Sequence, residues 1–202
     1  MSRPTSFLTI TALIFSAANA FPQSQVAYRA KVDDVKVMTQ KSPDFEVGSG
    51  IKDIKTDRRD WFQIDVEFAI ESTDSRNDFV GGVEVRFYAL PKSAQKAYKK
   101  LYSASINHVD VLKDTAVHSA VFLSPNALSR IYGKGKTGNP RDLMVAIEIW
   151  AGGKMVGFKI TDDEKSRWWR REDVPKDTTM LRPKHKTPFA SLWYDSYAEV
   201  RD

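Results

Sequence analysis

The residues with the clearest capacity for recognition chemistry are two adjacent tryptophans, Trp168 and Trp169, which lie between Arg167 and Arg170. Consecutive side chains of an extended segment point to opposite sides, so one indole ring can pack on a core while the other lies at the surface. An exposed indole ring stacks on a sugar or anchors a partner protein. These four residues are the candidate ligand or partner contacts. The competing interpretation, favoured by the usual burial of tryptophan, is that both rings cover the core beneath a long loop.

A second candidate constellation is the histidine-containing stretch with His108, Asp110 and His118. On a strand His108 and Asp110 share one face, and a hairpin would place His118 opposite them; two histidines and one aspartate can bind zinc. Val109 and Val111 have the pattern of the core-facing side, however. We therefore expect His108 and Asp110 to be ordinary outward-facing residues, and we predict no metal site.

Three further motifs match catalytic or ligand-binding templates only superficially. The Gly-Ser-Gly at 48–50 lacks the strand-to-helix context of a serine nucleophile, and Gly133–Thr137 lacks the GxxxxGK[ST] spacing of a phosphate loop. Asp162–Glu164 lacks the alternating oxygen ligands and the glycine of a calcium loop. Nothing in the sequence selects two of the 26 acidic residues as a catalytic pair. We predict no catalytic residue, no cofactor and no enzymatic activity; a hydrolase with an unrecognised site is the remaining alternative.

Composition narrows the classes of protein further. The 202 residues include no cysteine, which excludes disulfides, thiolate nucleophiles, iron–sulfur clusters and cysteine-bound zinc. A hydrophobic content of 42% is enough for a real core. The formal net charge is +5, but basic residues occur as scattered doublets such as Lys99-Lys100 rather than as a stripe. The sequence therefore predicts no nucleic-acid partner.

The N-terminus has the layout of a secretory signal peptide. Arg3 supplies a positive charge, Phe7–Phe15 is a short apolar run, and small residues at Ala18 and Ala20 form an A-x-A cleavage pattern. The alternative, a buried N-terminal strand, does not account for that pattern. We predict a signal peptide at residues 1–20 and no membrane span in the mature chain. The protein is then secreted, into the periplasm, onto the cell surface or outside a bacterium.

Alternating apolar and polar residues dominate the mature chain and predict half-buried antiparallel strands. In Trp61–Ile70 we expect the even-numbered apolar residues to face the core and Gln63, Asp65 and Glu67 to face water. Val83–Leu90 repeats the pattern. The glycine pair Gly152-Gly153 separates two β-rich runs and predicts a tight hairpin, because both positions can take positive φ.

Further strands are expected in several other runs. They are Val26–Met38, Ile106–Leu112 paired with Ala116–Leu123, Leu143–Ala151, Lys154–Thr161 and Phe189–Val200. Lys92–Ser103 and Pro125–Tyr132 favour short helices. About eight strands without a βαβ rhythm predict a mainly β fold. We expect a single antiparallel immunoglobulin-like β-sandwich over residues 21–202 with one or two short helices; a closed barrel is the alternative.

Several segments together resemble a known family. They are W-F-Q-I-D-V-E-F from Trp61, V-E-V-R-F-Y from Val83, A-V-F-L-S-P from Ala120, R-W-W-R from Arg167 and T-P-F-A-S-L-W-Y-D-S-Y from Thr187. With the signal peptide, they resemble the secreted pilus-like immunoglobulin-fold proteins of Verrucomicrobia, which are encoded with type IV pilus genes in mucin-degrading gut bacteria. The resemblance implies an immunoglobulin-like domain outside the inner membrane, pilus-associated and without enzymatic activity, and it carries over no functional residues.

The N-terminal region of the sequence differs from that of a true type IV pilin. A type IV pilin keeps a long apolar helix after its processing site, but here Phe21 is followed by Pro22 and a polar stretch. The chain therefore cannot build a pilin core. We expect a non-enzymatic protein that acts in adhesion, assembly or surface interaction with an envelope or pilus protein. The alternative is a carbohydrate-binding module that contacts a surface glycan through exposed tryptophans.

Overall fold

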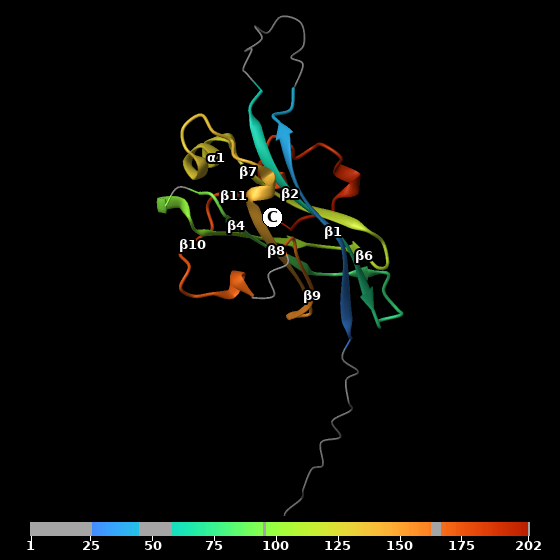
Figure 1. The fold of residues 1–202 in the computed structure, drawn as a ribbon. Coiled ribbons are helices and arrows are strands. Elements are labelled where there is room, and N and C mark those ends of the chain that lie inside the picture. The colour runs from blue at the N-terminus through green and yellow to red at the C-terminus, as the bar shows by residue number, and fades with distance from the viewer. Residues whose placement is uncertain (1–25, 45–57, 95, 163–166, 202) are drawn as a thin grey trace, which may run out of the picture.

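The computed structural model describes residues 26–44, 58–94, 96–162 and 167–201. The predicted signal peptide lies outside the described residues. Two sheets pack face to face around one core, and a small two-stranded sheet projects beside them. Figure 1 shows α1 and the β3–β6 pair on opposite sides of this sandwich.

The first sheet has the strand order β1-β2-β7-β11. Its strands are β1 (Tyr28–Lys41), β2 (Asp60–Ser72), β7 (Val117–Leu123) and β11 (Leu181–Pro183). The second sheet has the order β10-β5-β4-β8-β9. Its strands are β4 (Val83–Pro91), β5 (Leu101–His108), β8 (Leu143–Ala151), β9 (Lys154–Ile160) and β10 (Lys176–Asp177). The small sheet pairs β3 (Phe79–Val80) with β6 (Val111–Leu112).

All neighbouring strands are antiparallel except β10 and β5, which pair in parallel over two residues. The predicted mainly β, antiparallel sandwich is therefore confirmed. Its core forms as the alternation requires: Phe62, Ile64 and Val66 of β2 are fully buried. Val85 and Phe87 of β4 face them from the other sheet and are also fully buried. Burial of these apolar side chains is the main stabilising term of the fold.

Helices are short within the described residues. The α-helix α1 (Pro125–Tyr132) is confirmed as predicted, and its N-cap Ser124 accepts a hydrogen bond from the Ala127 amide at 3.2 Å. Five single 3₁₀ turns complete the set: η1 (Lys96–Tyr98), η2 (Pro140–Asp142), η3 (Trp168–Arg170), η4 (Lys184–Lys186) and η5 (Tyr194–Ser196). No helix among these described segments is long and apolar enough to cross a membrane.

The predicted Gly-Gly hairpin is confirmed between β8 and β9. Gly152 and Gly153 have φ of 56° and 74°, in the left-handed region that glycine enters without steric cost. On β9, Gly157 lies against β1 of the other sheet. A Cβ atom built at Gly157 would lie 2.8 Å from the carbonyl oxygen of Ala30, so only glycine fits this close approach. β1 thus runs beside β9 along one edge of the sandwich.

Three sequence expectations about elements are wrong. Lys92–Ser103 was expected to be a helix, but its described residues form only the turn η1 and the beginning of β5, because cross-strand pairing with β4 overrides a modest helix propensity. Ile106–Leu112 and Ala116–Leu123 do not pair with each other, since β5 belongs to the second sheet and β7 to the first. Phe189–Val200 forms turns and η5 rather than a strand.

Irregular segments of the chain pack on part of the outer face of each sheet, which the alternation did not predict. The segment around η3 packs on the second sheet. Residues 184–200, the C-terminal segment, pack on the first sheet, where Phe189 stacks on Phe122 with ring centroids 4.5 Å apart. Gln63 and Asp65 were expected to face water, but this cover buries both.

Candidate functional site

The Arg-Trp-Trp-Arg segment is part of the packing of the second sheet. Trp168 and Trp169 are each only 3% exposed, and they contact Leu101 and Met144 on the outer face of that sheet. The two rings meet edge to face, with centroids 5.6 Å apart. The interpretation of these rings as open contact surfaces is therefore wrong, and the structure places both over a hydrophobic cluster.

The flanking arginines also have structural contacts. Arg170 donates two hydrogen bonds to Glu148 Oε1, at 2.8 and 2.6 Å, and Trp169 Nε1 donates to the same oxygen at 2.9 Å. Burial alone would raise the pKa of Glu148, but these bonds and one from Trp150 outweigh it and lower that pKa. Arg167 lies with its guanidinium 5.7 Å from the ring centroid of Phe158. These residues hold the segment on the sheet.

The fold also keeps His108, Asp110 and His118 apart. His108 is 2% exposed and points inward, opposite to the expected orientation, whereas Asp110 is exposed at a turn with φ of 49°. His118 lies on the other sheet, where its Nδ1 is 2.7 Å from Asp65 Oδ1. Across the described ranges, no group of three or more metal-ligating side chains comes together.

His108 is tied to the C-terminal segment. Its Nδ1 lies 3.1 Å from the carbonyl oxygens of both Ala198 and Glu199, so this nitrogen carries the proton. Its Nε2 is then the acceptor for the Ser119 hydroxyl at 2.8 Å. Burial lowers the pKa of His108 to about 4, against the smaller opposing effect of the two carbonyls. His108 is therefore neutral at ordinary pH and anchors the end of the chain.

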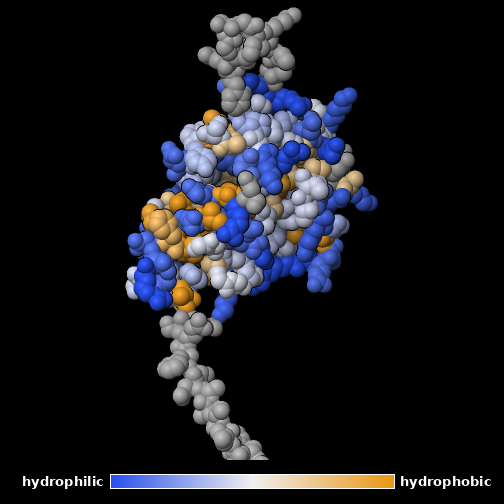
Figure 2. Space-filling view, turned by 180° about the vertical axis from the view of Figure 1, so that it is seen from behind, coloured by the Kyte–Doolittle hydropathy of each residue, from blue (hydrophilic) through white to orange (hydrophobic). Residues whose placement is uncertain are grey.

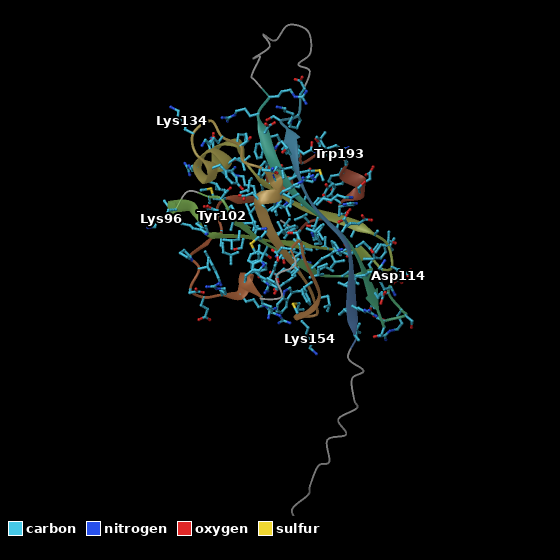
Figure 3. The ribbon with its side chains drawn as sticks, viewed as in Figure 1. Lys96, Tyr102, Asp114, Lys134, Lys154 and Trp193 are labelled. Carbon is cyan, nitrogen blue, oxygen red and sulfur yellow. The ribbon has the colours of Figure 1, made fainter. Side chains whose placement is uncertain are left out.

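A groove on the outer face of the first sheet brings together polar and aromatic side chains that sequence reasoning did not connect. We call it the Trp193 groove; its volume is about 310 Å³. Its lining residues are Lys36, Met38, Gln40, Gln63, Asp65, His118, Trp193, Ser196 and Tyr197. β1, β2 and β7 supply the floor, and the C-terminal segment supplies one wall. Figure 3 labels Trp193 at the periphery, on the side of β1.

The floor of the Trp193 groove is held by the buried carboxylate of Asp65. Tyr197 donates its hydroxyl to Asp65 Oδ2 at 2.6 Å, and Gln63 Nε2 donates to the same oxygen at 3.1 Å. Burial, with the bond to Asp65, raises the pKa of Tyr197. Lys184 lies under the Tyr197 ring, with Nζ 4.4 Å from the centroid. The network fixes the positions of these groups without any ligand.

Trp193 itself is 56% exposed and has φ of 51° and ψ of 37°. This left-handed conformation is unusual for a bulky residue. The adjacent Tyr194 is also exposed but does not line the groove. The sequence signal that could have drawn attention to this position is the Trp-Tyr pair near the C-terminus; its backbone conformation and the groove beside it follow from tertiary packing.

A second exposed feature is the small two-stranded sheet, which we call the β3–β6 ridge. Its outer pair, Phe79 and Leu112, are cross-strand partners and are 55% and 40% exposed. Its inner pair, Val80 and Val111, are buried in the main core. Figure 2 shows hydrophobic side chains gathered toward the side of the molecule on which this ridge lies.

These features define a class: a mainly β, antiparallel two-sheet sandwich with irregular segments of the chain packed on its outer faces. A protein-family model matches residues 22–202, and the chain belongs to that family.

Comparison with solved structures adds one relative at the level of fold. The crystal structure of a protein from Akkermansia muciniphila, a verrucomicrobial bacterium, superposes with a TM-score of 0.74 and 18% sequence identity. The match covers 88% of this chain and 95% of that chain. No curated protein sequence matches. The structural likeness supports the sandwich fold.

Proposed function

We propose that this chain is an exported, non-enzymatic protein of a bacterial envelope that acts by surface contact in the assembly of a pilus-like structure or in adhesion. The signal-peptide pattern and the resemblance to pilus-like proteins support the setting. The observation that carries the proposal is the β3–β6 ridge, which holds an aromatic and an aliphatic side chain side by side in solvent.

The ridge has the composition of a protein contact. Phe79 and Leu112 form an apolar centre, and the buried pair beneath them fixes their orientation. Charged residues follow Leu112 directly: the Lys113 ammonium donates a hydrogen bond to the carbonyl oxygen of Asp74 at 2.7 Å, and Asp114, labelled in Figure 3, is exposed at the adjacent turn. An apolar centre within a polar rim is typical of protein–protein interfaces. The partner that fits is an envelope or pilus protein with an apolar recess.

Site-specific photo-crosslinking in intact producing cells tests the proposal. A photoreactive phenylalanine derivative is placed at Phe79 or Leu112, and as a matched control at Phe158, an exposed aromatic on β9. We expect one discrete crosslinked envelope protein from both ridge positions and none from position 158. No discrete product from the ridge, or the same product from position 158, would contradict a contact at the ridge.

Carbohydrate binding is a second candidate, supported by a different observation. The tryptophans first considered for it are buried, but Trp193 is exposed beside a polar groove.

A further inference from the structure

The Trp193 groove has an exposed indole ring beside polar groups whose hydrogen-bonding capacity the fold uses only in part. A non-glycine residue in the left-handed region is strained, and bulky residues occur there seldom. The ring of Trp193 is mostly in water, so core burial does not compensate for this strain. The turn that holds it is closed by a hydrogen bond from the Ser196 amide to the Trp193 carbonyl at 3.1 Å. The backbone thus presents a large flat ring to solvent.

Polar groups beside this ring have unused hydrogen-bonding capacity. His118 has its Nδ1 on Asp65, and the structure gives its Nε2 no partner in the part of the chain that it describes. Gln40 has only a 3.6 Å contact from Nε2 to the sulfur of Met38. Gln63 is almost fully buried, and its Oε1 has no partner among the described residues. These groups offer an imidazole and two amides at the groove.

The charged groups at the groove already have partners within the protein. Lys36 Nζ lies 3.1 Å from Asp34 Oδ2, and the Asp65 carboxylate accepts from Tyr197 and Gln63 and faces His118. No unpaired cation among the described lining residues is therefore left for an anionic ligand. What the groove offers a ligand is a flat apolar ring face next to hydrogen-bonding side chains. A neutral sugar has the complementary surface, because one face of a pyranose ring is apolar and its edge carries hydroxyl groups.

We propose that the Trp193 groove binds a neutral saccharide, with a pyranose ring stacked on Trp193 and its hydroxyl groups bonded to His118 Nε2 and the Gln40 amide. A peptide is the less favoured occupant, because a groove for extended peptides usually offers unpaired strand backbone. Here β2 is paired on both sides, whereas β1 is the edge strand of its sheet, so peptide binding is included as an outcome of the test. The proposal rests on the second candidate function, carbohydrate binding, and names its ligand class and contacting residues; because it uses a separate surface from the β3–β6 ridge, its failure leaves the proposed ridge contact untouched.

The test measures how neutral disaccharides bind to the full mature chain, by saturation-transfer NMR and calorimetry. The sugars are lactose, maltose, cellobiose and N,N′-diacetylchitobiose. Trp193→Gly removes the ring at a position whose φ suits glycine, so the fold is kept. Tyr194→Ala is the matched control, since it removes an exposed neighbouring ring outside the groove. Thermal unfolding of each variant confirms that it is folded.

We expect at least one disaccharide to bind, Trp193→Gly to weaken that binding about tenfold or more, and Tyr194→Ala to leave it unchanged. Gln40→Ala, a second variant on β1, is expected to weaken binding several-fold through the loss of one hydrogen bond. Failure of the wild-type chain to bind any of the four sugars would overturn the proposal. So would equal binding by Trp193→Gly, or Trp193-dependent binding of a proline-rich peptide in place of sugar.

Discussion

Acid should lower the folding stability of this protein through protonation of His108, and the structure sets the size of this effect. The folded chain keeps His108 neutral down to a pKa of about 4, because burial disfavours its charged form, whereas the unfolded chain protonates it near the ordinary value of 6.5. Between these values the unfolded state binds more protons than the folded state. The stability is therefore complete above pH 6.5 and is lost as the pH falls toward 4.

The full difference between the folded and unfolded pKa of His108 corresponds to about 3 kcal/mol of unfolding free energy. About 2 kcal/mol of this is lost by pH 5.0, where few carboxyl groups have yet titrated. Urea unfolding of the wild type and of His108→Asn, at pH 7.5 and pH 5.0, isolates the contribution of His108 to the pH dependence of stability. The asparagine amide can still donate to the carbonyl oxygens of Ala198 and Glu199, but it does not titrate.

We expect the free energy of unfolding to fall by about 2 kcal/mol more in the wild type than in His108→Asn over this interval. The other titratable groups are present in both proteins, so their contribution cancels in the comparison. Equal pH dependence of the two proteins would refute the reasoning that a buried neutral His108 anchors the C-terminal segment.

Other predictions concern packing and export. Glu148→Ala should lower the unfolding free energy by about 3 kcal/mol in a urea titration, because it leaves Trp169 Nε1 and Arg170 unpaired; an effect below 1 kcal/mol would contradict that role. Gly157→Ala should cost about 1–3 kcal/mol through its clash with Ala30, whereas an unchanged melting temperature would show that β1 moves aside freely. N-terminal sequencing of the exported protein should begin at Phe21, and a start at Met1 would exclude the predicted cleavage.

The strands of the sandwich were largely predictable because their alternation records which face is buried. β2 and β4 coincide with the runs from Trp61 and Val83, and the Gly152-Gly153 turn needed only local information. The pairing of β7 was not predictable in the same way. Its partners β2 and β11 are distant in sequence, and residue pattern does not specify which sheet a strand joins.

The surface was harder to predict than the core. Gln63 and Asp65 have the pattern of solvent-facing residues, and they are buried only because the C-terminal segment, which has no regular periodicity, lies over them. The same reason explains why the adjacent tryptophans at 168 and 169 were candidates while Trp193 was not. Which indole is exposed depends on how irregular segments pack, and no local rule gives that.

Hydrogen exchange measured by mass spectrometry tests the central claim, action by contact at the surface, most directly. The mature chain is compared alone and with solubilised envelope from the producing bacterium. We predict slower exchange in peptides that cover β3 and β6, with no change at β9 around Phe158. Unchanged exchange at β3 and β6, or protection confined to β9, would contradict the account.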